Sequence, residues 1–297
     1  MGEAMKNVHT TLTVVVLAAV ATVANALAQS APATPPPADE LIRKACDAAG
    51  GLEAFRALGI VHLTLDRSEV AKDGTETKDQ ISFFFRAPGP IPARLENVER
   101  KVVAGDDGTG GWAINGGAVD QRAMTKFMVE RVIRTDLFQL LLPFSLTWEG
   151  VTVRNVAADT VDGTPAWRLD MAFPANFFFT PQISSNWRIY LHRDRATVLR
   201  AESDPTDLGG DMKADGMLIT WAKPVKLGEV WLFSEMVTLG RNLKGEILPH
   251  TRRDTMSYRL LPLTEAPKLF PNPIPPDKRP KPYKLEPPAQ PVPPPGE

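Results

Sequence analysis

The chain has 297 residues, a formal net charge of −1 and a single cysteine. A near-neutral balance without a basic stripe excludes the electrostatic footprint of a nucleic-acid-binding protein. One cysteine also excludes an intramolecular disulfide.

The N-terminus has the pattern of a secretory signal peptide. Lys6 precedes an apolar run over residues 12–24, and Ala26-Leu27-Ala28 forms a small-x-small cleavage site. The run is shorter than the roughly 20 residues that a membrane-spanning helix needs, and no later stretch approaches that length. We therefore expect residues 1–28 to be removed. The mature protein would be secreted across the inner membrane into the periplasm, without a transmembrane segment.

Proline divides the rest of the chain into three parts. Fourteen of the 28 prolines fall in residues 262–297, and four fall in residues 29–38. Such stretches favour an extended, polyproline-like backbone. The composition therefore predicts a linker over residues 29–38, one domain over residues 39–261, and an extended tail over residues 262–297 that could contact an envelope protein.

The domain opens with a short amphipathic helix. Apolar residues recur at three- and four-residue spacing from Leu41 to Ala49, and Gly50-Gly51 then separates them from Phe55. A helix this short is not stable alone in water, so its apolar face requires a surface to cover. We expect the segment to act as a plug over a curved sheet, with Cys46 as a small buried hydrophobic side chain.

Strand patterns fill most of the remaining domain. Alternation with period two, as in Trp167 and Leu169 against Arg168, indicates a sheet with one dry and one solvated face. One longer helix with a broad apolar face interrupts the strands at residues 122–142 and ends at Pro143. Short links between strands favour an antiparallel meander. The expected strands, about eleven in number, cover residues 60–69, 75–86, 93–103, 112–114, 151–158, 166–173, 187–192, 197–202, 216–222, 229–239 and 246–260.

These features resemble the lipoprotein-localisation carriers of the LolA/LolB-like fold superfamily. The resemblance rests on four segments: residues 48–55, the strand at 61–65, the helix end at 140–144 and the hairpin at 187–200. It implies an α+β fold in which a curved antiparallel sheet forms an unclosed half-barrel and helices cover its concave face. An apolar cavity between the helices and the sheet would hold acyl chains. The chain departs from the carriers in its greater length and in its proline-rich tail.

Large apolar side chains on the strands and helices are the candidate ligand contacts. Methionines and aromatic rings are typical of an adaptable apolar cavity, although they are also typical of a packed core. Three of them, Phe177, Phe178 and Phe179, stand in a loop, where exposure is unfavourable. They would pack into the core, form a lip at the cavity mouth, or form a partner-contact patch. The full set is Phe55, Phe83, Phe85, Met124, Phe127, Met128, Trp167, Met171, Phe177, Phe178, Phe179, Trp187, Trp221 and Trp231.

No catalytic, metal or cofactor constellation emerges from the sequence. The glycine-rich turns within residues 105–117 lack the helix that a phosphate-binding loop requires. Asp106-Asp107-Gly108 lacks the later acidic ligands of a calcium loop, and no GxSxG nucleophile motif is present. Each histidine of the domain stands alone, without the spacing of zinc ligands. Catalysis would therefore require four separate side chains to converge: His62, His192, His250 and Glu235.

Three functions remain open at this point. The first is an exported, monomeric binding protein that holds a lipid, an acyl chain or another hydrophobic molecule, with a role in envelope lipid or lipoprotein trafficking. The second is a non-enzymatic structural or interaction protein that uses its proline-rich tail. The third is a hydrolase-type enzyme whose site the sequence does not reveal. We prefer the first, because the one-sided strands, the tryptophans on their apolar faces and the two apolar helices all favour a hydrophobic binding site; these tryptophans are Trp167, Trp187, Trp221 and Trp231.

Overall fold

The computed structural model describes residues 34–174, 177, 187–209 and 212–279. The chain divides into two compact units, Met1–Pro35 and Pro36–Glu297, and the account below concerns the second. The expected signal peptide and most of the expected linker lie outside the described residues. Among the helices that the structure describes, none is both long and apolar enough to cross a membrane.

Helices and strands alternate little along the chain. The helices are α2 (Ala38–Ala48), α3 (Leu52–Arg56), α4 (Ala123–Leu140) and α6 (Ala266–Leu269), and the 3-10 turns are η1 (Phe144–Thr147), η2 (Leu263–Glu265) and η3 (Pro276–Lys278). The strands are β1 (Ile60–Val70), β2 (Glu76–Arg86), β3 (Ala93–Asn97), β4 (Val102–Asp106), β5 (Gly111–Asn115), β6 (Ala118–Val119), β7 (Thr152–Val161), β8 (Thr164–Ala172), β9 (Trp187–His192), β10 (Val198–Ser203), β11 (Thr206–Gly209), β12 (Met212–Ala214), β13 (Gly216–Leu227), β14 (Val230–Arg241) and β15 (Ile247–Leu261).

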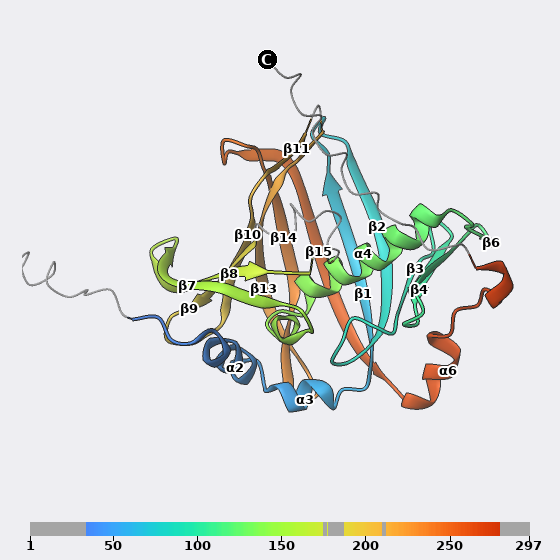
Figure 1. Ribbon diagram of the computed structural model, residues 1–297, viewed down its shortest axis with the longest axis horizontal. Coiled ribbons are helices and arrows are strands. Elements are labelled where there is room, and N and C mark those ends of the chain that lie inside the picture. The colour runs from blue at the N-terminus through green and yellow to red at the C-terminus, as the bar shows by residue number, and fades with distance from the viewer. Residues whose placement is uncertain (1–33, 175–176, 178–186, 210–211, 280–297) are drawn as a thin grey trace, which may run out of the picture. The chain divides into compact units, whose positions relative to one another are not determined.

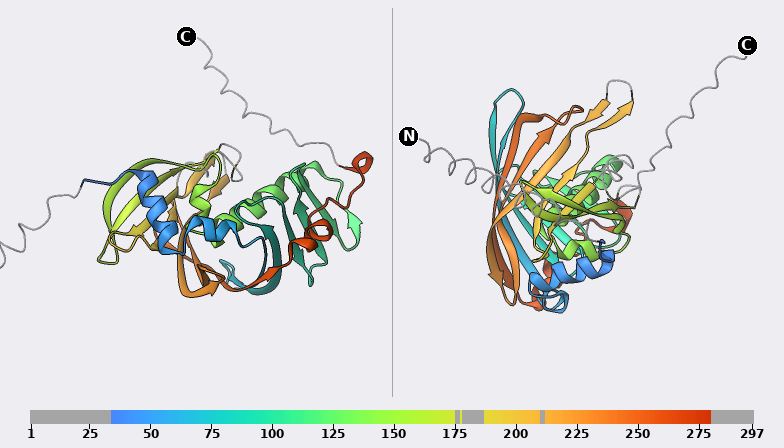
Figure 2. Two further views of the ribbon diagram at one scale, coloured as in Figure 1. Left: turned by 90° about the horizontal axis from the view of Figure 1, so that it is seen from below. Right: turned by 90° about the vertical axis from the view of Figure 1, so that its left-hand side faces the viewer.

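One large sheet dominates the fold. It has 13 strands in the order β6-β5-β4-β3-β2-β1-β15-β14-β13-β10-β9-β8-β7, while β11 and β12 form a separate hairpin. All neighbouring strands are antiparallel. Because β6 and β7 stand at opposite ends, the sheet is open, and Figures 1 and 2 show that it is curved. The α+β class and the unclosed half-barrel are confirmed.

Two meanders make up this sheet. The chain runs outward from β1 to β6, continues through α4, and returns from β7 to β15, which pairs with β1. β1 and β15 are the first and last strands of the sheet in chain order, and they therefore lie side by side in its middle. Short sequential links do not predict this pairing, since it joins residues from opposite ends of the domain.

The structure differs from the predicted strands in four places: it adds β6, β11 and β12, and it divides one predicted strand into two. Alternation predicts a single strand over residues 93–103, but β3 and β4 form a hairpin there. In the connecting turn, the Lys101 N–H donates to the Val98 carbonyl at 3.1 Å, and Lys101 has a φ of 54°. The Arg100 N–H donates to the Asn97 side chain at 2.9 Å. A polar turn of this length resembles the solvated face of a strand, so the sequence pattern hides it.

Helix α4 lies across one face of the sheet, which we call the inner face (Figure 1). Leu137 and Phe138 of α4 belong to the same buried cluster as Phe83 of β2. Phe55 of α3 stacks on Phe144 of η1 with ring centroids 4.3 Å apart. One hydrophobic core therefore fills the space between the helices and the inner face, as expected when an amphipathic helix covers a sheet.

The C-terminal end of α2 is docked tightly on the sheet. The Trp231 N–H of β14 donates to the Ala49 carbonyl at 2.8 Å. Cys46 is buried, as the sequence predicts, and its thiol lies 3.9 Å from the Pro143 carbonyl oxygen. Burial raises the pKa of this thiol to about 11, which keeps it protonated and unreactive at neutral pH.

The first part of the expected tail packs against the domain. We call residues 262–279 the C-terminal strap; it contains η2, α6 and η3. Phe270 and Ile274 are buried within it. The Asn272 N–H donates to Asp107 at 3.3 Å, and Arg279 donates to the Thr109 hydroxyl at 3.1 Å. These contacts tie the strap to the loop after β4.

Candidate functional site

Most of the candidate ligand contacts are parts of the packed core. Phe83 and Phe85 on β2 are fully buried, and Phe138 meets Trp187 edge-to-face at 6.3 Å. Trp221 is partly buried, and its indole N–H donates to the Gln139 carbonyl at 3.1 Å. The other buried candidates are Phe55, Phe127, Trp167, Met171 and Phe177. Phe178 and Phe179 lie outside the described residues.

Phe177, the described member of the three-phenylalanine loop, packs into the core. Its ring meets Phe138 edge-to-face with centroids 5.8 Å apart, and it lies 4.9 Å from the ring of Phe173. These contacts extend an aromatic cluster around the C-terminal half of α4. At this position the loop therefore contributes to packing.

Met124 and Met128 remain exposed and lie together beside the sheet. Their side chains are 45% and 39% exposed, although they are large and apolar. They line a hollow of about 400 Å³ between α4 and the strands β3 and β4, which we call the α4 groove. All its lining residues except Arg122 and Thr125 are apolar; the full set is Leu95, Val102, Ala104, Arg122, Met124, Thr125, Met128, Val129, Val132 and Ile133.

Close backbone contacts fix α4 beside this groove. A Cβ atom on Gly111 would lie 2.5 Å from the Lys126 carbonyl oxygen, so only glycine permits the observed approach of β5 to the helix. The Gly111 N–H donates to the Glu130 carboxylate at 2.9 Å. The helix is thus anchored at β5, whereas the flank that faces β3 and β4 stays open.

Trp231 lies at a different hollow. Its side chain is 46% exposed and lines a space of about 410 Å³ between α2 and the strand β14, which we call the α2 pocket. Ala45, Ala49 and Leu232 also line it. The predicted candidates therefore do not converge on one cavity: two of them line the α4 groove, one lines the α2 pocket, and most of the rest fill the core.

A charged cluster beneath α4 was not predicted from the sequence. Arg67 of β1 donates to Asp254 of β15 at 2.8 Å and to Asp136 of α4 at 3.4 Å. Arg252 pairs with Asp254 at 3.1 Å and donates to the Gln139 side chain at 2.9 Å. We call Arg67, Asp136, Arg252 and Asp254 the buried charge cluster.

The four groups of this cluster are paired with one another and largely shielded from solvent. Asp254 is completely inaccessible to solvent. Burial pulls the pKa of Arg67 down, but Asp136 and Asp254 outweigh that effect and hold the pKa above its usual range. One sequence feature does point to the cluster: Leu63, Leu65 and Arg67 alternate along β1, which places a charge on the dry face.

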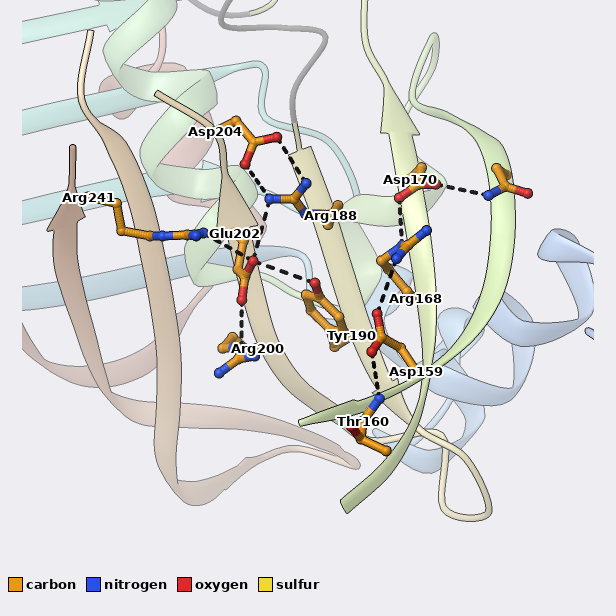
Figure 3. Close-up of polar contacts among 11 residues, drawn as sticks. Asp159, Thr160, Arg168, Asp170, Arg188, Tyr190, Arg200, Glu202, Asp204 and Arg241 are labelled. Carbon is orange, nitrogen blue, oxygen red and sulfur yellow. Dashed lines mark hydrogen bonds and ion pairs between the residues drawn. The ribbon is translucent and has the colours of Figure 1, made fainter. Parts of the chain in front are cut away.

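Ion pairs also cover the outer side of β8, β9 and β10 (Figure 3). The Glu202 carboxylate forms ion pairs with Arg200 at 2.9 Å, Arg241 at 3.1 Å and Arg188 at 3.5 Å. A polar cleft of about 500 Å³ adjoins them and is lined partly by Arg168. Partly exposed pairs of this kind contribute about 0–1 kcal/mol each. Since the arginines already have carboxylate partners, the cleft offers little free charge for a ligand.

Three of the four residues that catalysis would require have partners of their own, while the fourth, His250, lies against Gly240. His62 stacks on Phe84 with ring centroids 4.4 Å apart, and burial lowers its pKa. His192 accepts N–H groups of the following turn, and Glu235 is bound by Lys223 at 2.5 Å. Within the described residues, no contact joins two of the four, and no group of three or more metal-ligand side chains occurs.

Comparisons with known proteins identify a fold. No protein-family model and no curated protein matches the sequence. Among solved structures, the chain is similar to a LolA superfamily protein from Nitrosomonas europaea, with 11% identity, coverage of 80% of this chain and 99% of that chain, and a TM-score of 0.52. It is also similar to a DUF1329 family protein from Desulfovibrio piger, with 14% identity, coverage of 78% and 97%, and a TM-score of 0.50. At such identities the likeness is one of architecture: this chain has the LolA-like fold.

Proposed function

We propose that the protein is an exported, periplasmic binding protein that holds a hydrophobic ligand, such as a lipid acyl chain, in the α4 groove. The observation that carries this proposal is the pair Met124 and Met128, which stay exposed at an apolar hollow of about 400 Å³. This function requires the groove only to bind its ligand, so it needs no catalytic residue.

The size and lining of the groove suit such a ligand. Binding sites for small molecules are typically concave, mostly apolar and about 300–1,000 Å³ in volume. Methionine side chains are flexible and polarisable, so they adapt to ligands of varied shape. Exposed apolar side chains that gather in one hollow are also unfavourable in water, and a bound chain would remove that penalty.

The groove lies where the fold offers space for a ligand. It is formed between a helix on the inner face and two strands near one end of the open sheet. The core beneath the rest of α4 is filled by buried side chains such as Phe83 and Phe138. A hydrocarbon chain in the groove would therefore contact the exposed flank of α4 and leave that core unchanged.

The proposal is tested by titrating the full exported chain with N-phenyl-1-naphthylamine, whose fluorescence rises in an apolar site. We expect the wild-type protein to bind this probe, and oleate to displace it. Met128→Glu places a carboxylate in the groove, and desolvating that charge should weaken probe binding at least about tenfold. Native mass spectrometry of the purified protein should also detect a co-purified lipid.

Two matched variants locate the binding site. Leu243→Glu makes the same type of change at an exposed apolar residue outside the groove and should leave probe binding unchanged. Trp231→Glu changes the α2 pocket and should also have little effect. Loss of binding in Trp231→Glu with retention in Met128→Glu would contradict the assignment to the α4 groove. Absence of probe binding by the wild-type chain would contradict the proposed function.

A further inference from the structure

Three buried hydroxyl or imidazole atoms on the inner face have no hydrogen-bond partner in the described part of the chain. They are the hydroxyl oxygen of Thr135 on α4, the hydroxyl oxygen of Thr238 on β14 and Nδ1 of His250 on β15. Thr238 is only 8% exposed. Buried polar groups are nearly always hydrogen-bonded, because an unsatisfied group loses its bonds to water without replacement. Unpartnered atoms in one region therefore indicate a missing partner.

The strand register brings these residues together. Thr238 of β14 pairs with Arg252 of β15, and directly paired residues point to the same face of a sheet. Gly240 lies two residues after Thr238 on β14, and His250 lies two residues before Arg252 on β15. The His250 ring lies over Gly240, where an added Cβ atom would be 1.9 Å from the ring. Only a glycine leaves room for the imidazole in this position.

Helix α4 supplies the other side of the same region. The Gln139 side chain accepts a hydrogen bond from Arg252 at 2.9 Å, which places this end of the helix over the β14–β15 pair. Thr135 stands one helical turn earlier. We call Thr135, Gln139, Thr238, His250 and Arg252 the polar end.

The polar end continues the flank of α4 that lines the apolar groove. Met124, Met128, Thr135 and Gln139 are separated by four, seven and four residues, so their side chains follow one face of the helix. With a rise of 1.5 Å per residue, Met128 and Gln139 are about 16 Å apart along the helix axis. One helix face thus changes from apolar to polar along its length, and this gradient matches an amphiphile lying along it.

Charge balance selects the kind of head group. The buried charge cluster, which shares Arg252 with the polar end, contains two arginines and two aspartates, all paired with one another. An added anion would lie next to two carboxylates and would find both guanidinium groups occupied. Arg252 Nε also lacks a hydrogen bond, but it lies 3.1 Å from the Asp254 carboxylate, which compensates its charge. The other unpartnered atoms of the polar end belong to hydroxyls and an imidazole, which can bond to neutral hydroxyl, ester or amide groups.

We propose that the polar end receives the uncharged, hydrogen-bonding head group of an amphiphile whose hydrocarbon chain lies in the α4 groove. This inference rests on the proposed function and specifies the class of ligand. The Thr238 hydroxyl makes a direct hydrogen bond to the head group. Within the described residues this hydroxyl has no other hydrogen-bond partner.

The test compares two lipids with the same chain and different head groups. The full chain is titrated at pH 8 with monoolein, which is neutral, and with oleate, which is ionised. We expect monoolein to bind at least about tenfold more tightly, because its neutral hydroxyls can bond to the unpartnered atoms without placing a negative charge beside Asp136 and Asp254. Thr238→Val, which keeps the shape and removes the hydroxyl, should weaken monoolein binding about tenfold and leave oleate binding nearly unchanged.

The same variant has an opposite effect on the empty protein. Removing an unsatisfied buried hydroxyl should raise the melting temperature without ligand by about 2–4 °C. Thr220→Val is the matched control. It makes the same substitution on β13, where Thr220 alternates with Ile219 and Trp221 and so points to the other face of the sheet. It should change neither the affinity for monoolein nor the preference over oleate.

The outcomes separate this inference from the function on which it rests. If the wild-type chain binds neither lipid, the proposed function and the inference both fail. If it binds both lipids equally, or if Thr238→Val binds monoolein as tightly as the wild type, only the inference fails. A lower melting temperature of empty Thr238→Val would mean that the hydroxyl has a structural partner, such as a buried water molecule, and would also overturn the inference.

Discussion

At the scale of single residues, the adjacent glycines Gly50 and Gly51 are required for different reasons. Both have a positive φ, but only Gly50 also makes a close backbone contact. Gly50 and Gly51 both have positive φ, at 105° and 98°, and together turn the chain from α2 into α3. A Cβ atom on Gly50 would lie 2.3 Å from the Glu229 carbonyl oxygen, whereas one on Gly51 would have no neighbour within 4 Å. Gly50 therefore also allows α2 to approach the β13–β14 turn closely.

Alanine substitutions should separate these two roles. Gly51→Ala should lower the free energy of unfolding by about 1–2 kcal/mol, because a side chain disfavours positive φ. Gly50→Ala should lose a further 1–3 kcal/mol, roughly, because the new methyl group meets backbone atoms that cannot move aside. Urea unfolding of both variants measures the difference. Equal losses would show that the contact with Glu229 does not matter.

At the scale of elements, the buried charge cluster determines how α4 is seated. The helix supplies Asp136, and the sheet supplies Arg67, Arg252 and Asp254 from the adjacent strands β1 and β15. Pairs of this kind stabilise a structure only slightly relative to apolar residues, since desolvation offsets their attraction. Removing one partner is different, because it leaves an unpaired charge in the interior.

A double substitution should reveal this asymmetry. Asp254→Asn should lower the free energy of unfolding by about 3–5 kcal/mol, because Arg67 and Arg252 lose their shared carboxylate. The combination of Arg67→Met and Asp254→Leu should recover most of that loss. Glu235→Gln, which breaks the solvent-side pair with Lys223, should change stability by less than about 1 kcal/mol. If the double variant is less stable than Asp254→Asn alone, the charges themselves stabilise the fold.

At the scale of the whole molecule, the sheet is completed only when the last strand forms. β15 pairs with β1 on one side and β14 on the other, so it joins the two meanders. The C-terminal strap follows β15 directly and runs back to the loop after β4. The strap thus connects the two meanders a second time, through side chains rather than through a strand ladder.

Two truncations should show what the strap contributes. A chain that ends at Arg279 keeps every described contact of the strap and should unfold at the wild-type urea concentration. A chain that ends at Leu261 loses the burial of Phe270 and Ile274, which amounts to about 3–6 kcal/mol. Equal stability of the two truncated proteins would mean that the strap contributes nothing to the free energy of unfolding.

The sequence by itself determined the fold class, the one-sided strands and the positions of the two main helices. These follow from periods of 2 and 3.6 residues, which are local properties that a packed sheet or helix imposes on its own residues. The same local patterns could not separate the β3–β4 turn from a strand, because a polar turn and a solvated strand face have the same composition. The division into linker, domain and tail stays a prediction.

Only the tertiary structure decided which apolar side chains are core and which stay exposed. Phe83 and Met128 are equally good candidates in sequence, but Phe83 is covered by other elements and Met128 is not. The contact between Arg67 and Asp254 spans 187 positions of the chain, so no local pattern contains it. The polar end depends on α4, β14 and β15 together. Burial and pairing are properties of the assembled elements, which is why the site appears only once they are packed.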